Sequence, residues 1–192
     1  KQSGGAGQFA DVVLTVGPLA RGDGFRFSEV VKGGAVPRNY IPSVEEGARD
    51  ALAKGPLGFP VTDLAVTLMD GKHHAVDSSD FAFRTAGRMA LREALPKCAP
   101  VLLQPIHRIS IHVPSIFSGA MVSLVSSLSG QVLGFDRDET HRGWDVFRAL
   151  LPVSVIDDLV QALGSATQGF AWHEAEFDHY EEMPAHISQE VI

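Results

Sequence analysis

Polar and ionisable side chains are concentrated in the short segment 70–79. In chain order they are Asp70, His73, His74, Asp77, Ser78 and Ser79. An imidazole is planar and donates a hydrogen bond while nearly neutral at pH 7, so His74 could stack on a base or bond to one. A solvated hairpin loop is the simpler interpretation, and the residues alone leave both open.

The same segment carries the atoms of a metal site, with ligand groups on Asp70, His73, His74 and Asp77. Adjacent histidines point in different directions along a backbone, and the helical histidine spacing of zinc enzymes is absent, so we expect no metal here. The run from Asp77 to Ser79 is typical of a helix-capping cluster, which would fix the exit of the loop and stiffen it around His74.

The glycine-rich start of the chain is a second candidate, with Gly4, Gly5, Gly7 and Gln8. It follows neither the phosphate-loop pattern nor the dinucleotide spacing, so the residues alone indicate a flexible loop. Lys32 could touch a phosphate, although a solvated turn lysine is the simpler interpretation. No catalytic residue is assigned, because Cys98 has no recognisable base partner.

The elements that must position these loops follow from periodicity. Residues 8–16 alternate as a strand, which Phe25 and Phe27 continue after a turn, and a further strand covers 64–68. The spacing from Ser43 to Glu46 predicts a capping box for a helix over 44–54, with Gly55 as its stop. Ser78 or Ser79 is expected to cap a second helix. That helix carries Phe81, Thr85, Met89 and Leu95.

The order of strands and helices changes after the linker 96–100, which has a proline at each end. The pattern predicts a strand over 109–113, a helix over 117–128, strands over 131–135 and 144–151, a helix over 155–163 and a strand over 170–177. This βαββαβ order is that of a ferredoxin-like sandwich. Trp144 and Trp172 are expected in its core. We therefore predict an α+β protein with two domains, residues 1–99 and 100–192.

Composition and net charge limit the classes of protein to which this chain can belong. The 192 residues are 45% hydrophobic and 20% charged, as in an ordinary globular chain. No apolar run approaches the ~20 residues that span a bilayer, and a single cysteine favours a reducing cytoplasm. The net charge of −7 argues against non-specific nucleic-acid binding, but local contacts to RNA remain compatible with it.

The first half resembles domain IV of bacterial elongation factor G, a β-rich, ribosomal-protein-like βαβ domain. The matching motifs are the glycine loop at 4–9, the connector 32–42 with its Gly33-Gly34, Pro37 and Pro42, the approach 55–61, and the loop 74–79. The resemblance implies that Gly4, Gly5, Gly7, Gln8, His73 and His74 form the tip that reaches the ribosomal decoding site. Asp77, Ser78, Ser79 and Lys32 would support it.

The second half resembles domain V of the same family, through 100–106, 165–169 and 179–184. In the family this domain lies near the stalk base and the sarcin-ricin loop of the large subunit. Four positions where the family has arginine are neutral here, which removes groups that pair with phosphate. They are Leu128, Ser129, Gly164 and Phe170.

The resemblance implies a monomeric, cytoplasmic fragment of a translational GTPase, with no cofactor of its own. GTP and magnesium would bind domains of the parent protein outside this chain. The partners would be the ribosome and the tRNA–mRNA pair, with no membrane, and the work would be translocation. The missing arginines indicate an elongation factor G-like paralogue. The alternative is a ribosome-binding regulatory or recycling paralogue that does not translocate.

Overall fold

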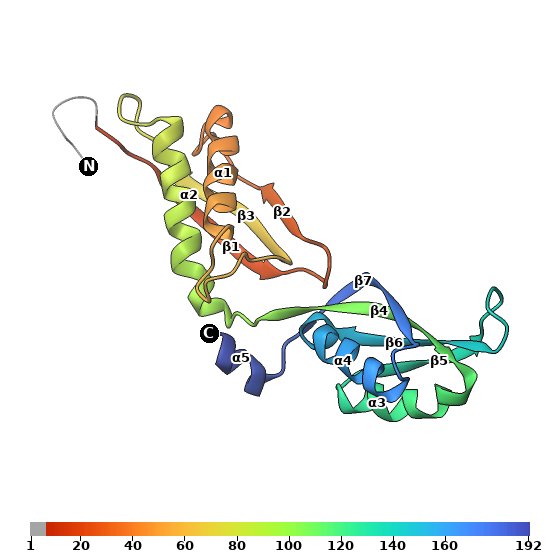
Figure 1. The fold of residues 1–192 in the computed structure, drawn as a ribbon. Helices are drawn as coiled ribbons and strands as arrows, with labels where there is room; N and C mark the ends of the chain where they lie inside the picture. Colours follow the sequence, from red (N-terminus) through yellow and green to blue (C-terminus); the bar gives the residue numbers. More distant parts are fainter. Residues whose placement is uncertain (1–6) are drawn as a thin grey trace. The chain divides into compact units, whose positions relative to one another are not determined.

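The computed structural model describes residues 7–192 and divides the chain into two compact units (Figure 1). Unit 1 ends at Leu102 and also includes Ala185–Ile192, which contains the short helix α5 (Ala185–Val191). Unit 2 spans Leu103–Pro184. Within the described residues, no helix is long and apolar enough to cross a membrane.

Unit 1 is built on a three-stranded sheet with the strand order β1-β3-β2. Strand β1 (Asp11–Pro18) pairs antiparallel with β3 (Leu64–Lys72), whereas β2 (Phe25–Glu29) pairs parallel with β3. A parallel pair needs a crossover connection, and helix α1 (Ile41–Leu52) supplies it. The predicted βαβ domain is confirmed.

Helices α1 and α2 (Asp80–Ala94) lie side by side against the sheet and enclose its core (Figure 1). Glycines let their backbones meet. A Cβ built on Gly87 would lie 2.6 Å from the carbonyl oxygen of Val44, and one on Gly47 would overlap the carbonyl of Arg84. The fully buried side chains of this core include Val44, Ala48, Val66, Leu68, Phe83 and Leu91.

The predicted capping box at the start of α1 is wrong. The helix begins at Ile41, with Pro42 in its first turn, where a missing N–H costs nothing. Ser43 is therefore inside the helix, and its buried hydroxyl donates to Asp80 Oδ1 at 2.8 Å. Gly55 is not the stop either, because α1 ends three residues earlier and a Cβ on Gly55 would overlap the side chain of Val61.

The predicted helix after Ser79 is present, but two of its apolar residues face solvent. Phe81 is 60% exposed and Met89 is 63% exposed. The buried face instead follows Phe83, Gly87 and Leu91, four residues apart. Hydropathy counting overlooks this face because its middle position is a glycine, which is buried for close helix contact rather than for apolar area.

Unit 2 is a four-stranded sheet with the order β5-β6-β4-β7, covered on one face by two helices. Its strands are β4 (Leu103–Pro114), β5 (Gln131–Arg137), β6 (Trp144–Pro152) and β7 (Trp172–Glu182), and its helices are α3 (Met121–Ser127) and α4 (Ile156–Ala166). Neighbouring strands are all antiparallel. The predicted ferredoxin-like sandwich is confirmed.

Some details of unit 2 differ from the sequence prediction. The segment predicted as one helix from residue 117 starts as a 3-10 helix, Ser115–Ala120, before α3. Trp172 is not a core residue, since it is 42% exposed. It pairs across strands with His112, whose neighbours Ile111 and Val113 point into the core, so both rings lie on the sheet face away from the helices.

Candidate nucleic-acid interface

Three segments of unit 1 meet at one end of the sheet, beyond β1 and β3. The chain entering β1 bonds to the loop after β3, with Phe9 N–H donating to the carbonyl of Asp77 at 2.8 Å. Gly7 N–H donates to the Asp77 carboxylate at 2.9 Å. The connector before α1 joins them through Tyr40, whose hydroxyl donates to the carbonyl of Ser78 at 3.3 Å. We call Gly7–Phe9 and His73–Ser79 the tip loops.

Ser78 and Ser79 have different structural roles, whereas the sequence left open which of the two caps α2. Ser79 is the N-cap of α2, since its hydroxyl accepts from Ala82 N–H at 3.1 Å. Ser78 instead bridges the two tip loops, because its hydroxyl accepts from His74 N–H and donates to the carbonyl of Phe9, both at 2.8 Å. The two tip loops are therefore one hydrogen-bonded body.

His74 stands out from this body, with 55% of its side chain exposed. Its Nδ1 faces inward and accepts from the N–H groups of Val76 and Asp77 at 3.3 and 3.2 Å. The ring lies edge-on to Phe9, with 6.4 Å between centroids. The ring is therefore exposed while its orientation is fixed by the loop.

His73 and Lys32 occupy different positions from His74. His73 is exposed, but its Nδ1 lies 3.2 Å from the carbonyl of Ala35, so the ring turns back to the connector. Lys32 is exposed and contributes its carbonyl, which accepts from Ala35 N–H at 3.3 Å. The turn needs Gly33 and Gly34, whose φ angles are +63° and +70°.

The remaining sequence candidates are only partly placed. Gly4 and Gly5 lie outside the described residues, and Gln8 is exposed beside Gly7. Among residues 7–192, no group of three histidine, cysteine or acidic side chains is arranged to hold a metal ion. The sequence placed Tyr40 in the matching connector but gave it no role at the site; its ring stacks on Phe83 at 4.9 Å between centroids and anchors the connector. An aromatic residue between two conformationally restricted prolines, Pro37 and Pro42, was the available signal.

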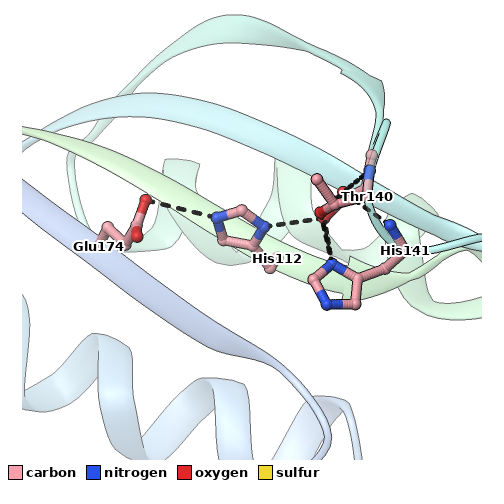
Figure 2. A network of polar contacts seen from close by, with 5 residues as sticks. His112, Thr140, His141 and Glu174 are labelled. Carbon is pink, nitrogen blue, oxygen red and sulfur yellow. Dashed lines mark hydrogen bonds and ion pairs between the residues drawn. The ribbon is translucent and has the colours of Figure 1, made fainter.

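A second polar cluster lies on unit 2, around the loop between β5 and β6 (Figure 2). His112 on β4 lies between two carboxylates, with Nδ1 3.0 Å from Asp138 and Nε2 3.6 Å from Glu174. Its ring stacks on Trp172 at 3.7 Å between centroids. Asp138 Oδ1 also accepts from the hydroxyl of Thr140 at 2.6 Å and from two backbone N–H groups.

This cluster holds the hairpin loop to the sheet. Hydrogen bonds from Thr140 and His112 hold the pKa of Asp138 well below its usual range. Thr140 and His141 do not form a nucleophile–base pair, since the same ring nitrogen, His141 Nδ1, faces both Thr140 and Asp138. A relay needs the two ring nitrogens for two different partners.

The neutral positions of unit 2 are mostly on its surface. Ser129 and Gly164 are exposed, and Phe170 is 60% exposed. Leu128 differs, because it packs against the core of unit 2. An arginine side chain at Ser129, Gly164 or Phe170 would reach solvent. The neutral residues at these three positions therefore make the surface of unit 2 less positive than arginines would.

Comparisons with known proteins agree with this two-unit architecture. The family description "Elongation factor G, domain IV" matches residues 1–99, and "Elongation factor G C-terminus" matches residues 101–191. An "Elongation factor G-like protein" from Synechocystis sp. is 47% identical over 186 residues and covers 95% of this chain. A crystal structure of a protein from Thermus thermophilus covers 100% of this chain with a TM-score of 0.89 and 34% identity.

The fold and these matches define a two-domain segment of a translation-factor family. The chain belongs to the elongation factor G family, and it consists of segments that correspond to domains IV and V. It spans about a quarter of its relatives' length, 27% of the Synechocystis protein and 28% of the Thermus chain.

Proposed function

We propose that this chain is the ribosome-contacting arm of a longer, elongation factor G-like translational GTPase. In this proposal, domains outside the chain bind GTP and magnesium and hydrolyse the nucleotide. Unit 1 carries the tip loops into the decoding site of the small subunit, where they contact the tRNA–mRNA pair. Unit 2 contacts the large subunit near the stalk base and the sarcin-ricin loop.

One observation carries the proposal: His74 is exposed at the end of a body whose segments, within residues 7–192, are hydrogen-bonded to one another. The loop is bonded to Gly7 and Phe9 on one side and to Tyr40 on the other, and it leads directly into the capped helix α2. A contact residue on such a support loses little entropy on binding. A rigid tip of this kind can occupy a site and prevent RNA from slipping back.

The test is His74→Ala in the full-length protein, with single-turnover translocation and ribosome-stimulated GTP hydrolysis measured together. Loss of one hydrogen bond to a charged or polar RNA group costs about 1.5 kcal/mol, so translocation should slow roughly 10-fold. GTP hydrolysis should stay nearly intact, because the nucleotide site lies elsewhere. The matched control is His186→Ala, which removes an exposed histidine from α5. Unchanged translocation in His74→Ala would remove this residue from the mechanism.

A second candidate is a paralogue that binds ribosomes to regulate or recycle them without translocating. The neutral surface at Ser129, Gly164 and Phe170 favours it, because weaker phosphate pairing would alter how unit 2 engages ribosomal RNA. The Synechocystis relative is itself named as elongation factor G-like. The same translocation assay separates the two candidates, since the full-length wild-type protein would show no translocation under the second.

A further inference from the structure

One face of helix α2 combines an exposed aromatic ring with cationic side chains. Its members recur at the four- and three-residue spacing of a single helix face, and they are Phe81, Thr85, Arg88 and Arg92. We call these four residues the outer face of α2. Phe81 is 60% exposed, Arg92 is exposed and Arg88 is half-buried. Aromatic rings and guanidinium groups interleaved in this way are the groups that proteins use to hold single-stranded nucleic acid.

The two arginines of the outer face have no carboxylate of their own. The neighbouring helix α1 contributes Glu46 and Asp50, but both pair with Arg84, at 3.5 and 2.8 Å. The hydrogen bond from Arg84 holds the pKa of Asp50 below its usual value, and the nearby charges of Arg88 and Arg92 act in the same direction. Among residues 7–192, neither Arg88 nor Arg92 forms an ion pair, and the buried Nε of Arg88 has no hydrogen-bond partner. This side of α2 therefore has an excess of positive charge.

The acidic residues of α2 itself do not cancel this charge. Asp80 accepts from the hydroxyl of Ser43 on the α1 side at 2.8 Å, and Glu93 pairs with Lys97 at 3.0 Å. The two units also differ in charge. Unit 2 has four basic against eleven acidic residues and so accounts for the whole net charge of −7, whereas unit 1 is balanced. The charge of the chain therefore opposes a polyanion such as RNA least at unit 1.

The spacing of the outer face is suited to one strand of RNA. Arg88 and Arg92 are about one helical turn apart, roughly 6 Å along the axis, so their flexible side chains can reach neighbouring phosphates of the same strand. Phe81 lies in the first turn of α2, two residues after the N-cap Ser79 that ends the loop of His74. A strand that contacts His74 can therefore continue along α2.

We propose that the outer face of α2 is a second RNA-binding surface, which holds one RNA strand as it leaves the tip loops. Phe81 stacks on a base of that strand, and Arg88 and Arg92 pair with its phosphates. The occupant is a single strand rather than a duplex, because the bases of a duplex are not free to stack on a side chain. The location on the ribosome rests on the proposed function, whereas the chemistry of this face does not.

The salt dependence of ribosome binding by the full-length protein tests the two arginines. Arg88→Gln and Arg92→Gln should each make the log–log slope shallower by about 0.7, the value for one phosphate contact to a single strand. The matched control is Arg26→Gln, which removes the same charge from the sheet face away from the helices, since Arg26 alternates with the core-packed Phe27. It should leave the slope unchanged. Unchanged slopes in both α2 variants, or an equal decrease in Arg26→Gln, would overturn the proposal.

Variants of Phe81 separate base stacking from an apolar contact. Phe81→Ala should weaken binding roughly 5- to 150-fold with no change in the salt slope, which is the range for one lost stacked base. Phe81→Trp should keep the affinity, whereas Phe81→Leu should lose most of it, because leucine is apolar but has no ring to stack. Met89→Ala is the matched control, since Met89 is 63% exposed on the same helix, and it should change the affinity little. Wild-type binding by Phe81→Leu, or an equal loss in Met89→Ala, would indicate an apolar protein partner and contradict the proposal.

A tethered cleavage probe identifies the partner directly. Met89→Cys with Cys98→Ser, in an otherwise cysteine-free full-length protein, places one attachment point beside the outer face of α2. Hydroxyl radicals from an iron chelate attached there should cleave RNA when the protein is bound to the ribosome. Cleavage of protein chains alone would overturn the proposal. If probes at residue 89 and, through Ala75→Cys, at residue 75 both cleave RNA only outside the decoding site, the proposed function fails and the RNA-binding surface stands.

Discussion

The glycine contact between α1 and α2 predicts a large effect from adding one methyl group. In Gly47→Ala, the new Cβ would overlap the Arg84 carbonyl, and at Gly87 the backbones already approach so closely that a Cβ would be 2.6 Å from the Val44 carbonyl oxygen. The helices would have to separate, which loosens the packing of Val44 and Leu91. Since the tip loops lead into α2, this contact also fixes the support of His74.

The magnitude follows from two opposing effects. Overpacking a close contact costs up to about 3 kcal/mol, while alanine gains about 1 kcal/mol over glycine in a helix. The net loss of about 2 kcal/mol should lower the Tm of unit 1 by roughly 8–16 °C, given the size of the domain.

The unfolding of the two units can be followed separately because of where the tryptophans lie. Trp144 and Trp172 are the only two in the chain and both lie in unit 2, so their fluorescence follows unit 2, whereas resolved NMR signals of unit 1 follow its own unfolding. Gly47→Ala should move only the unit 1 transition. The matched control is Gly164→Ala on α4, where a Cβ meets open space, and it should raise the unit 2 transition by a few degrees. A Tm of unit 1 that is unchanged or higher in Gly47→Ala would refute the close helix contact.

Two other predictions concern unit 2. Hydrogen bonds lower the pKa of Asp138 in the folded state, so they stabilise unit 2 above the ordinary carboxyl pKa, and this contribution is lost as the pH falls. Asp138→Asn should therefore lower the stability of unit 2 at pH 7 and reduce the loss of stability on acidification, as followed by tryptophan fluorescence. An unchanged loss of stability on acidification would contradict the role of the cluster. The neutral Ser129, Gly164 and Phe170 should reduce the salt dependence of ribosome binding. Each lost phosphate contact removes about 0.7–0.9 from the log–log slope, so the slope should be shallower by roughly 2 to 3 than that of an elongation factor G with arginines at these three positions. Equal slopes would count against a paralogue with weakened rRNA contact.

The sequence predicted the order of the strands and helices because alternation and helical periodicity are strong in both units. Helix starts were harder to predict, since Ser43 and Glu46 fit a capping box equally well whether or not proline begins the helix earlier. The burial of Gly47 and Gly87 was not predictable from hydropathy, because glycine has no side chain to count.

Site residues were predicted where a local motif exists. The pairing of Ser79 with Ala82 follows capping rules, whereas the bonds from Gly7 and Phe9 to the segment around Asp77 join residues about 70 positions apart. The carboxylate of Asp63 makes a similar long-range contact, since it accepts from Gly22 N–H and Gly24 N–H. The backbone of Asp63 itself has a φ angle of +60°. Such contacts arise from strand register and have no signature in one segment.

The most direct measurement of the central claim is the location of the tip loops on the ribosome. The exposed Cys98 is the chain's single cysteine, so Cys98→Ser with Ala75→Cys places one attachment point beside His74. An iron chelate attached there in the full-length protein should generate hydroxyl radicals that cleave small-subunit RNA at the decoding site. Cleavage confined to other regions of the ribosome would contradict the account.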